Sequence, residues 1–347
     1  MLTLIYFVLI LGVIVLVHEF GHFIFSKLFG VYVHEFSIGM GPAIFQRQGK
    51  NKETTYSLRA IPIGGYCALA GEDDEMDKDV PKDRCLQNKP IWQRFIIMVA
   101  GAMNNFILAV IILLLIATFA GAPNLDPIIG SVETGGPAEQ AGLEAGDRVT
   151  RINNDKVSTT DDLAIFLQLA DMSKPVTFYV TKEDGTETTY EVTPIAEEVD
   201  GTTTYRIGVT IDNEVRHDVL SVLSYTARKT GSLFKQMIIS FQALFTGRVG
   251  FDQLSGPVGI YQIVGAQSET GLANMFYLVA LLSVNVGFLN LLPIPAMDGG
   301  RIFLLLIELI KRKPVKPETE NLVNTVGFIL LLALMLLVTI NDVVKLF

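Results

Sequence analysis

Four long stretches without a charged residue constrain this chain more than any other feature of its sequence. They run from Met1 to Val17, from Phe95 to Ala122, from Thr270 to Met297 and from Asn321 to Asn341. A helix needs roughly 20 apolar residues to cross a bilayer. We therefore expect a polytopic α-helical membrane protein with four transmembrane helices, at about residues 1–28, 95–121, 271–296 and 322–341.

A secretory signal peptide is the alternative for the first stretch. Such a segment begins with a basic region and ends at a cleavage site of small residues. No lysine or arginine precedes Lys27 in this chain. A membrane-spanning helix is therefore favoured over a cleaved leader.

Basic residues indicate how the predicted helices are oriented. Residues 30–94 contain nine lysines and arginines, and residues 301–316 contain five. Short connections that are rich in these residues stay in the cytoplasm. The connection after residue 122 has the length of a domain, and such segments cross the membrane largely regardless of charge. Both basic loops are therefore predicted to be cytoplasmic, and both chain termini to lie outside.

Composition excludes one class of partner. The chain carries 27 basic and 36 acidic side chains, a formal net charge of −9, whereas nucleic-acid binding needs a basic surface. Nucleic acid is therefore not an expected partner. Cys67 and Cys85 are too few for a disulfide framework, and their spacing matches no metal or redox pair.

Residues 123–215 carry the pattern of a small α+β domain. Strands are predicted at 128–132 and 149–152, a capped helix at 161–169 and a hairpin at 176–192. Gly142 and Gly146 fit turn positions that need positive φ, and their run Ala-Gly-Leu-x-x-Gly-Asp resembles that of a PDZ domain. PDZ domains bind peptides by adding a strand to a sheet edge. We expect this extracytoplasmic domain to bind a peptide or to control access, with a simple spacer as the alternative.

The predicted organisation places this domain between two halves of a membrane core. The first half is 1–122 and includes a membrane-associated β-hairpin on the cytosolic side within residues 30–94. The second half is 270–347, with an interfacial helix at about 300–312 that is too short to span. Residues 216–269 are predicted to be an amphipathic segment along the outer membrane surface, where a lateral gate is one conceivable role.

The first apolar stretch contains its own exception, the run His18-Glu19-Phe20-Gly21-His22. On a helix, His18 and His22 lie one turn apart on the same face. Neutral imidazoles suit zinc, and the adjacent Glu19 can take a proton from a water whose pKa the metal lowers. Ionisable groups inside a membrane helix cost on the order of 3 kcal/mol each and are functional by default. We interpret the run as a zinc-binding HExxH motif, with a polar cluster that packs helices as the alternative.

A catalytic zinc site usually has a third protein ligand. His34 and His217 are the other histidines of the chain, and His217 is predicted to lie across the membrane. Asp298 is the carboxylate at the end of the third apolar stretch. Pro293 and Pro295 break the helix just before it and free backbone groups for water or substrate. Asp298 is thus a candidate ligand at the cytoplasmic depth of the histidine pair.

With these residues in place, the chain resembles the site-2 protease family of intramembrane zinc metalloproteases (bacterial RseP/RasP type, peptidase family M50B) over essentially its whole length. The resemblance rests on the HExxH run, on the PDZ-like segment and on a second motif similar to Asn-x-x-Pro-x-x-x-Leu-Asp-Gly at residues 290–299. It implies one Zn²⁺ per chain, with His18, His22 and Asp298 as ligands and Glu19 as the general base.

The same resemblance implies supporting residues and a biological setting. Asn290 and Pro293 match the second motif, and Gly101 and Asn105 resemble a Gly-x-x-x-Asn element of the family's second span. The expected location is the bacterial cytoplasmic membrane, with the active site toward the cytoplasm and the PDZ domain outside. Expected partners are the lipid bilayer and single-span membrane-protein substrates, such as anti-sigma factors or remnant signal peptides.

A substrate helix must unwind before water can reach a peptide carbonyl, so a part of the protein must hold the extended segment. The family has a membrane-associated β-hairpin at the position of residues 54–69 here, and that hairpin adds a strand to the substrate. Gly64 allows close backbone approach. We expect the binding edge to comprise Gly65, Tyr66, Cys67 and Ala68.

Two amides of the third apolar stretch complete the predicted substrate site. Asn285 and Asn290 are expected to bond the unwound backbone or the oxyanion of the reaction. Packing between helices is the alternative role for both.

Two functions from different classes follow. In the first, the chain is a zinc-dependent endopeptidase that cleaves transmembrane segments. In the second, it is a catalytically inert membrane scaffold or receptor whose PDZ domain binds peptides. The joint presence of two histidines, Glu19 and Asp298 favours the enzyme.

Overall fold

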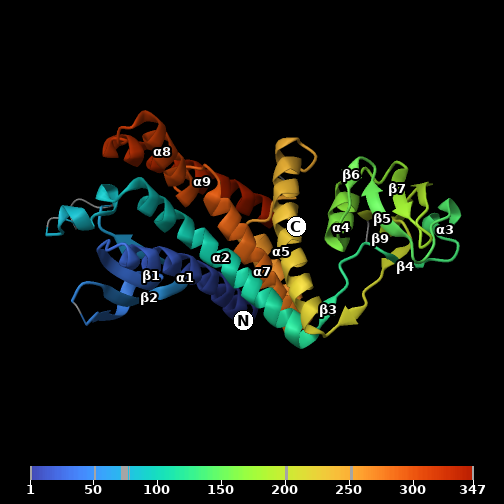
Figure 1. Ribbon diagram of the computed structural model, residues 1–347, viewed down its shortest axis with the longest axis horizontal. Helices are drawn as coiled ribbons and strands as arrows, with labels where there is room; N and C mark the ends of the chain where they lie inside the picture. The colour runs from blue at the N-terminus through green and yellow to red at the C-terminus, as the bar shows by residue number, and fades with distance from the viewer. Residues whose placement is uncertain are drawn as a thin grey trace. The chain divides into compact units, whose positions relative to one another are not determined.

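The computed structural model describes residues 2–50, 52–71, 77, 79–199, 202–250 and 253–345. The chain divides into two compact units. The first comprises Met1–Ile112 together with Asp252–Phe347, and the second comprises Leu113–Phe251. The second unit is therefore an insertion in the first, and each has its own set of helices and strands (Figure 1).

Among the described residues, four helices are long and apolar enough to cross a membrane. They are α1 (Leu2–Leu28), α2 (Ile91–Ala120), α7 (Leu272–Leu291) and α9 (Pro317–Val344). The most apolar 18-residue stretch of each helix has a mean hydropathy between 1.8 and 2.5. The prediction of four apolar spans is thus confirmed by the helices of the structure.

The third span is shorter than predicted. We expected a helix to about residue 296, but α7 ends at Leu291. Pro293 and Pro295 explain the difference, because proline lacks the N–H that a continuing helix would use and restricts the residue before it. The chain instead forms an irregular loop at 292–297 before α8 (Asp298–Lys311) begins. That loop carries Asp298 to its position.

Close helix contacts hold the first unit together. A Cβ built on Gly21 of α1 would lie 2.3 Å from the carbonyl oxygen of Ala100 on α2, so the two backbones nearly touch there. Small residues allow such approaches between membrane helices. Nearer the N-terminus of α1, Ile10 and Ile14 are buried against Val264 of α6 (Pro257–Glu269) and against α7.

A folded sheet of two long strands follows α1. The strands are β1 (Val33–Gln48) and β2 (Thr55–Leu69). The register pairs residues 33–38 of β1 with residues 65–69 of β2 on one side, and residues 35–38 also pair with residues 55–58 on the other. Residues 45–48 pair with 55–58 as well. The predicted hairpin is therefore a sheet in which 65–69 pairs on one side only within the described part of the chain.

An apolar cluster fixes this sheet to the helices. Val33 from the start of β1 and Leu69 from the end of β2 are buried with Ile97 and Met98 of α2 and with Leu305 of α8. Two short 3-10 turns, η1 (Lys82–Arg84) and η2 (Leu86–Asn88), connect the sheet to α2. The segment 65–69 is consequently held beside α1, which carries His18 and His22, and beside α2, which carries Gly101.

The described residues of the second unit form one four-stranded sheet and three two-stranded sheets. The larger sheet has the strand order β6-β5-β7-β8, and the small ones pair β11 with β4, β10 with β9 and β12 with β3. The strands are β3 (Ala122–Pro123), β4 (Ile129–Val132), β5 (Arg148–Ile152), β6 (Asp155–Lys156), β7 (Val176–Thr181), β8 (Glu187–Val192), β9 (Ile195–Val199), β10 (Thr202–Arg206), β11 (Val209–Ile211) and β12 (Val215–Arg216), with helices α3 (Pro137–Ala141) and α4 (Thr160–Leu169). Phe178, Ile129 and Leu163 are almost fully buried in its core.

Local signals in this unit were predictive. Gly142 and Gly146 adopt positive φ, at 96° and 93°. Thr159 caps α4 because its side chain accepts a hydrogen bond from the N–H of Asp162, and the Asp162 carboxylate accepts one from the Thr159 N–H. The predicted hairpin is the antiparallel pair β7–β8. These elements agree with the predicted α+β segment, whereas its assignment as a PDZ domain stays a prediction.

Residues 216–269, which were predicted to be an amphipathic segment along the outer membrane surface, contribute to both units. Their place at a membrane surface stays a prediction. Helix α5 (Val219–Phe245) packs against α4, where Lys229 forms a 2.7 Å ion pair with Asp161. Helix α6 belongs to the first unit, where its Val264 is fully buried against α1 and α7.

Candidate metal centre and active site

Three side chains converge on one point of the first unit. His18 and His22 lie one turn apart on α1, and Asp298 is the first residue of α8. The two Nε2 atoms are 3.2 Å apart, and they lie 3.1 Å and 3.3 Å from Oδ2 of Asp298. The structure thus brings together three residues that the sequence analysis selected separately.

The spacing of these atoms fits a zinc ion. Zinc bonds to imidazole nitrogen and carboxylate oxygen are about 2.0–2.1 Å long, so two ligands of a tetrahedron lie about 3.3 Å apart. Asp298 Oδ2 is buried and makes no aligned hydrogen bond with any described residue, although two ring nitrogens lie within ion-pair distance. A buried carboxylate oxygen in that condition fits a metal ligand better than a hydrogen-bonded ion pair.

Backbone contacts set the orientation of the α1 residues. Nδ1 of His22 donates to the carbonyl oxygen of Ile97 on α2, at 2.8 Å. This bond directs Nε2 of the same ring toward the cluster, as the outer partner of a metal-binding histidine does. Asn104 of α2 donates to the carbonyl of Val17 at 3.2 Å and so holds the turn that precedes His18. Sequence reasoning missed Asn104, although an amide inside an apolar stretch was the available signal.

Gly101 leaves room for both imidazoles. A Cβ at this position of α2 would lie 2.5 Å from Nε2 of His22 and 2.8 Å from Nε2 of His18. Real Cβ atoms essentially never approach that closely. Gly101 is therefore required for the rings to occupy their places, which gives a physical reason for its predicted supporting role.

Asp298 is positioned by a tightly folded loop. Ala296 has φ of 69°, in the left-handed region that non-glycine residues rarely adopt. A Cβ on Gly299 would lie 2.0 Å from the carbonyl oxygen of Leu292, and one on Gly300 would lie 2.5 Å from that of Ile294. The loop therefore folds back onto the first turn of α8, and only glycine fits at these two positions.

Glu19 points from α1 toward the sheet. Its Oε2 accepts a hydrogen bond of 3.1 Å from the backbone N–H of Cys67 in β2. Cys67 pairs with Phe36 on its other side. The predicted binding edge thus lies beside the predicted general base.

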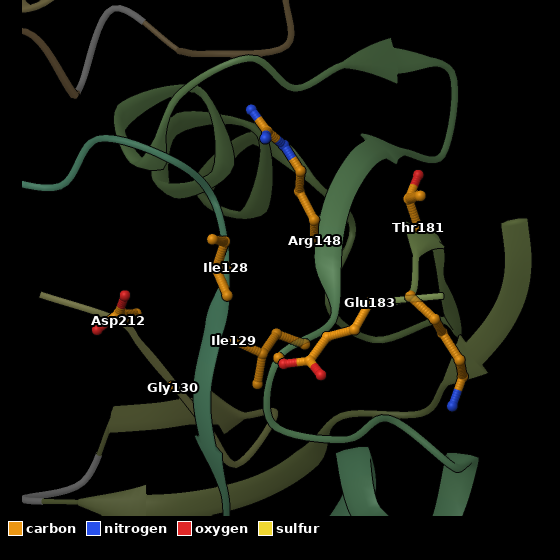
Figure 2. Close-up of a pocket in the computed structure, with 9 residues that line it drawn as sticks. Ile128, Ile129, Gly130, Arg148, Thr181, Glu183 and Asp212 are labelled. Carbon is orange, nitrogen blue, oxygen red and sulfur yellow. The ribbon is translucent and has the colours of Figure 1, made fainter. Parts of the chain in front are cut away.

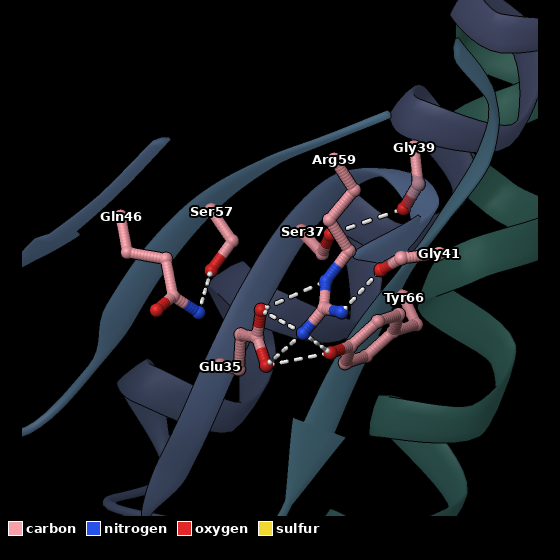
Figure 3. Close-up of polar contacts among 8 residues, drawn as sticks. All are labelled: Glu35, Ser37, Gly39, Gly41, Gln46, Ser57, Arg59 and Tyr66. Atoms are coloured by element: carbon pink, nitrogen blue, oxygen red, sulfur yellow. Dashed lines mark hydrogen bonds and ion pairs between the residues drawn. The ribbon is translucent and has the colours of Figure 1, made fainter. Parts of the chain in front are cut away.

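A polar network of the sheet includes the side chain of Tyr66. The Tyr66 hydroxyl donates to Glu35 at 2.5 Å, and the Arg59 guanidinium donates to the same carboxylate at 2.7 Å (Figure 3). Arg59 also contacts the Tyr66 hydroxyl. Burial and the bond to Glu35 raise the pKa of Tyr66 to about 12. The hydroxyl therefore stays protonated at neutral pH and ties residues 65–69 to β1.

The remaining predicted residues are placed less directly. Asn105 is fully buried on α2, and its backbone carbonyl accepts a bond from Ser283 of α7 at 2.9 Å. The side-chain amide of Asn105 and the Oδ1 of Asn285 have no hydrogen-bond partner among the described residues. Asn290 is half-buried in the last turn of α7, and Pro293 follows in the loop. The predicted roles of these residues stay predictions.

The chain matches a known protein family and several of its members. The model of peptidase family M50 matches residues 6–334. The chain is 32% identical to the zinc metalloprotease RasP of Bacillus licheniformis and 32% identical to the regulator of sigma-W protease RasP of Bacillus subtilis, in each case over 99% of both chains. It is also 32% identical to the zinc metalloprotease RasP of Oceanobacillus iheyensis, over 100% of both chains.

Proposed function

The chain belongs to peptidase family M50 and is a metalloendopeptidase, and from this premise we propose that it hydrolyses peptide bonds within the transmembrane segments of single-span membrane proteins. The observation that carries the proposal is the convergence of His18, His22 and Asp298, whose three ligand atoms lie within 3.1–3.3 Å of one another at the end of two apolar spans. We propose that they hold one zinc ion.

The proposed reaction uses residues of α1. When bound, zinc lowers the pKa of water and polarises a carbonyl oxygen. Glu19 takes up the proton of the attacking water and later delivers it to the leaving amine. The bond from His22 Nδ1–H to the carbonyl of Ile97 orients Nε2 of the same ring toward His18 and Asp298, where it would serve as a zinc ligand. The apolar helices around the cluster exclude bulk water, which strengthens each electrostatic interaction within it.

We further propose that residues 65–68 hold the substrate as an added strand. In support, residues 65–69 pair with 33–38 on one side, while the N–H of Cys67 points away from that pairing toward Glu19. A substrate segment on this edge would pass beside the general base. Asn285 and Asn290 are proposed to bond the unwound backbone or the oxyanion of the substrate.

The second unit is proposed to act as an extracytoplasmic PDZ domain that binds a peptide or restricts access. An open cavity of about 540 Å³ beside β4 supports a binding role (Figure 2). Its lining includes Ile129 and Gly130 of β4 and the charged residues Arg148, Glu183 and Asp212. These groups offer hydrogen bonds and charge to an extended segment.

The setting proposed for the enzyme is the bacterial cytoplasmic membrane, with the metal site toward the cytoplasm. The basic loops at 30–94 and 301–316 support that orientation. The relative named regulator of sigma-W protease suggests anti-sigma factors as a substrate class, and remnant signal peptides are a second. Both classes present a single apolar helix.

Removal of the metal tests the proposal. Protein purified in detergent should contain about one zinc per chain, lose cleavage of a transmembrane reporter on chelation, and regain it when zinc is restored. His22→Ala should lose both zinc and cleavage, whereas His217→Ala, an exposed histidine of the second unit, should retain both. Cleavage that persists without metal would contradict the proposal, and a wild type without zinc or cleavage would favour an inert scaffold.

The edge proposal makes a separate prediction for Cys67. Cys67→Pro removes the N–H that points away from β1 and that donates to Glu19 in this structure, so the pairing with 33–38 can persist while the bond that a substrate carbonyl would take over from Glu19 is lost. We expect kcat/KM for the reporter to fall about tenfold, with zinc content unchanged, since one hydrogen bond contributes about 0.5–1.5 kcal/mol. Cys67→Ala keeps the N–H and serves as the control. Equal cleavage by the two variants would argue against substrate binding at this edge.

A further inference from the structure

Helix α9 differs from the other spans in how little of it is buried. Only 6% of the most apolar 18-residue stretch of α9 is buried, whereas 17% to 39% of the corresponding stretch is buried in α1, α2 and α7. Its side chains at Leu330 and Leu336 are more than 60% exposed. Such a helix faces lipid over most of its surface. The few places where it contacts the rest of the first unit therefore determine its position.

The first of these places is the loop that carries Asp298. Oδ1 of Asn324 accepts a hydrogen bond from the N–H of Ala296 at 3.3 Å. One turn farther along α9, Gly327 lies so close to Pro295 that a Cβ there would be 2.2 Å from the proline Cβ and 2.8 Å from its carbonyl oxygen. Helix α9 therefore presses on the two residues of the loop that precede Met297.

This contact acts on a strained segment. Ala296 has φ of 69°, and a residue keeps such a conformation only when its surroundings enforce it. A cavity of about 380 Å³ lies between the loop and α9, lined by Met297, Asp298, Asn324 and Phe328 among others. Beside that space, the hydrogen bond of Asn324 and the close approach of Gly327 connect α9 to the loop.

The second place is the other end of α9. Asp342 is 4% exposed, and its Oδ2 accepts hydrogen bonds from the N–H groups of Gly256 and Gly259 at 2.9 Å and 2.8 Å. These donors belong to the start of α6, where a carboxylate is stabilised by unpaired amides and by the helix dipole. A Cβ on Gly256 would lie 2.8 Å from the same oxygen, so glycine is required there.

Helix α6 connects this anchor to the histidines. Its Val264 is buried with Ile10 and Ile14 of α1, the helix that also carries His18 and His22. Helix α9 is thus fixed to the histidine-bearing part of the unit at one end and to the Asp298 loop at the other. Two of the three candidate ligands come from α1, and the third is the first residue of α8, directly after the loop. The distance between these two parts therefore decides whether a metal fits.

We propose that α9 is a brace for the metal centre, in which Asn324 and Gly327 are positioning residues for Asp298 and the bonds from Asp342 to α6 anchor the brace. The inference rests on the proposed zinc-dependent function. Ligand atoms must be held to within about 0.5 Å for tight metal binding. The brace supplies that restraint to a loop whose own conformation is strained.

The test at the loop uses zinc affinity and the visible spectrum of the Co²⁺-substituted full-length protein in detergent. Asn324→Leu should weaken zinc binding about tenfold, the lower end of the effect of outer-shell substitutions, and should reduce the tetrahedral Co²⁺ absorption. Asn324→Asp keeps an oxygen acceptor and should stay within about twofold of wild type. Asn321→Leu, the same change one turn earlier, should have no effect.

The test at the far anchor separates the brace from a local role. Residues 324 and 342 are 18 positions apart, about 27 Å along a helix. If Asp342 only stabilised α6, zinc affinity would be unchanged by its loss, whereas the brace predicts about tenfold weaker zinc binding in Asp342→Leu. Asp342→Asn keeps an acceptor oxygen and should restore affinity, and the exposed Ala333→Val should match wild type. Circular dichroism reports whether each variant is folded.

The outcomes distinguish a failure of the brace from a failure of the proposed function. Wild-type zinc binding together with unchanged zinc and Co²⁺ properties in Asn324→Leu and in folded Asp342→Leu would overturn the brace alone. A wild-type protein that binds no zinc would overturn the proposed function and the brace with it. Should Asp342→Leu fail to fold, the comparison of Asn324→Leu with Asn324→Asp still decides the proposal.

Discussion

Replacing Glu19 by glutamine is expected to abolish cleavage while zinc stays bound. Glutamine keeps the size of the side chain, and its amide oxygen can still accept the bond from Cys67 N–H that Glu19 accepts at 3.1 Å. It cannot take up a proton from water. General-base catalysis typically contributes 10²–10⁴-fold, so turnover of a transmembrane reporter should fall by about 10³-fold. Zinc content should remain at about one per chain because the three candidate ligands are untouched.

A matched substitution controls for the loss of a charge. Glu187 is exposed on β8 in the second unit, and Glu187→Gln should cleave the reporter at the wild-type rate. Zinc content measured on the same preparations separates a catalytic defect from a binding defect. If Glu19→Gln cleaved as fast as wild type, Glu19 could not be the base, and a loss of zinc would assign it to metal binding instead.

The histidine pair and the spans were predictable because both depend on local periodicity. Residues i and i+4 of a helix share a face, so His18 and His22 had to be neighbours once the first apolar stretch formed a helix. Absence of charge over a bilayer's thickness likewise predicts a span without knowledge of its neighbours. Asp298 was selected by the prolines before it and by family resemblance, and the structure places it at the histidines.

The outer partners of the site could not be predicted in the same way. Ile97 bonds to His22 through its backbone carbonyl, and a carbonyl leaves no mark in the sequence. Asn104 carried a signal, as an amide in an apolar stretch, but nothing in the sequence said which turn of α1 it would reach. Such contacts depend on the crossing point of two helices, which is a property of their packing.

The sheet shows the same limit for strands. A β-hairpin was predicted at residues 54–69, and residues 55–69 form the strand β2. Pairing of 35–38 with both halves of that strand is a non-local arrangement that no local pattern of residues predicts. Residues 216–269 show a related limit, because amphipathic character does not say which unit a helix packs against, and α5 and α6 belong to different units.

Gly101→Ala is expected to displace both imidazoles of the candidate metal centre. The added Cβ would lie 2.5 Å from Nε2 of His22 and 2.8 Å from Nε2 of His18. Either the rings turn away or α2 moves off α1, and the second response is opposed by the contact of Gly21 with Ala100. Both candidate ligands would be displaced together, so zinc affinity should fall by at least about 100-fold, the upper end of what outer-shell changes produce.

The measurement is zinc affinity by competition with a chromophoric chelator, alongside helix content from circular dichroism. Gly231→Ala is the matched control, because Gly231 lies in helix α5 and a Cβ there meets nothing within 4 Å. It makes the same chemical change and should leave zinc affinity as in wild type. Wild-type zinc binding by folded Gly101→Ala would mean that the imidazoles move aside at little cost, and the metal would then have to bind with a different arrangement of His18 and His22. Loss of zinc without loss of helix would instead tie the role of Gly101 to the space that it leaves for the two rings.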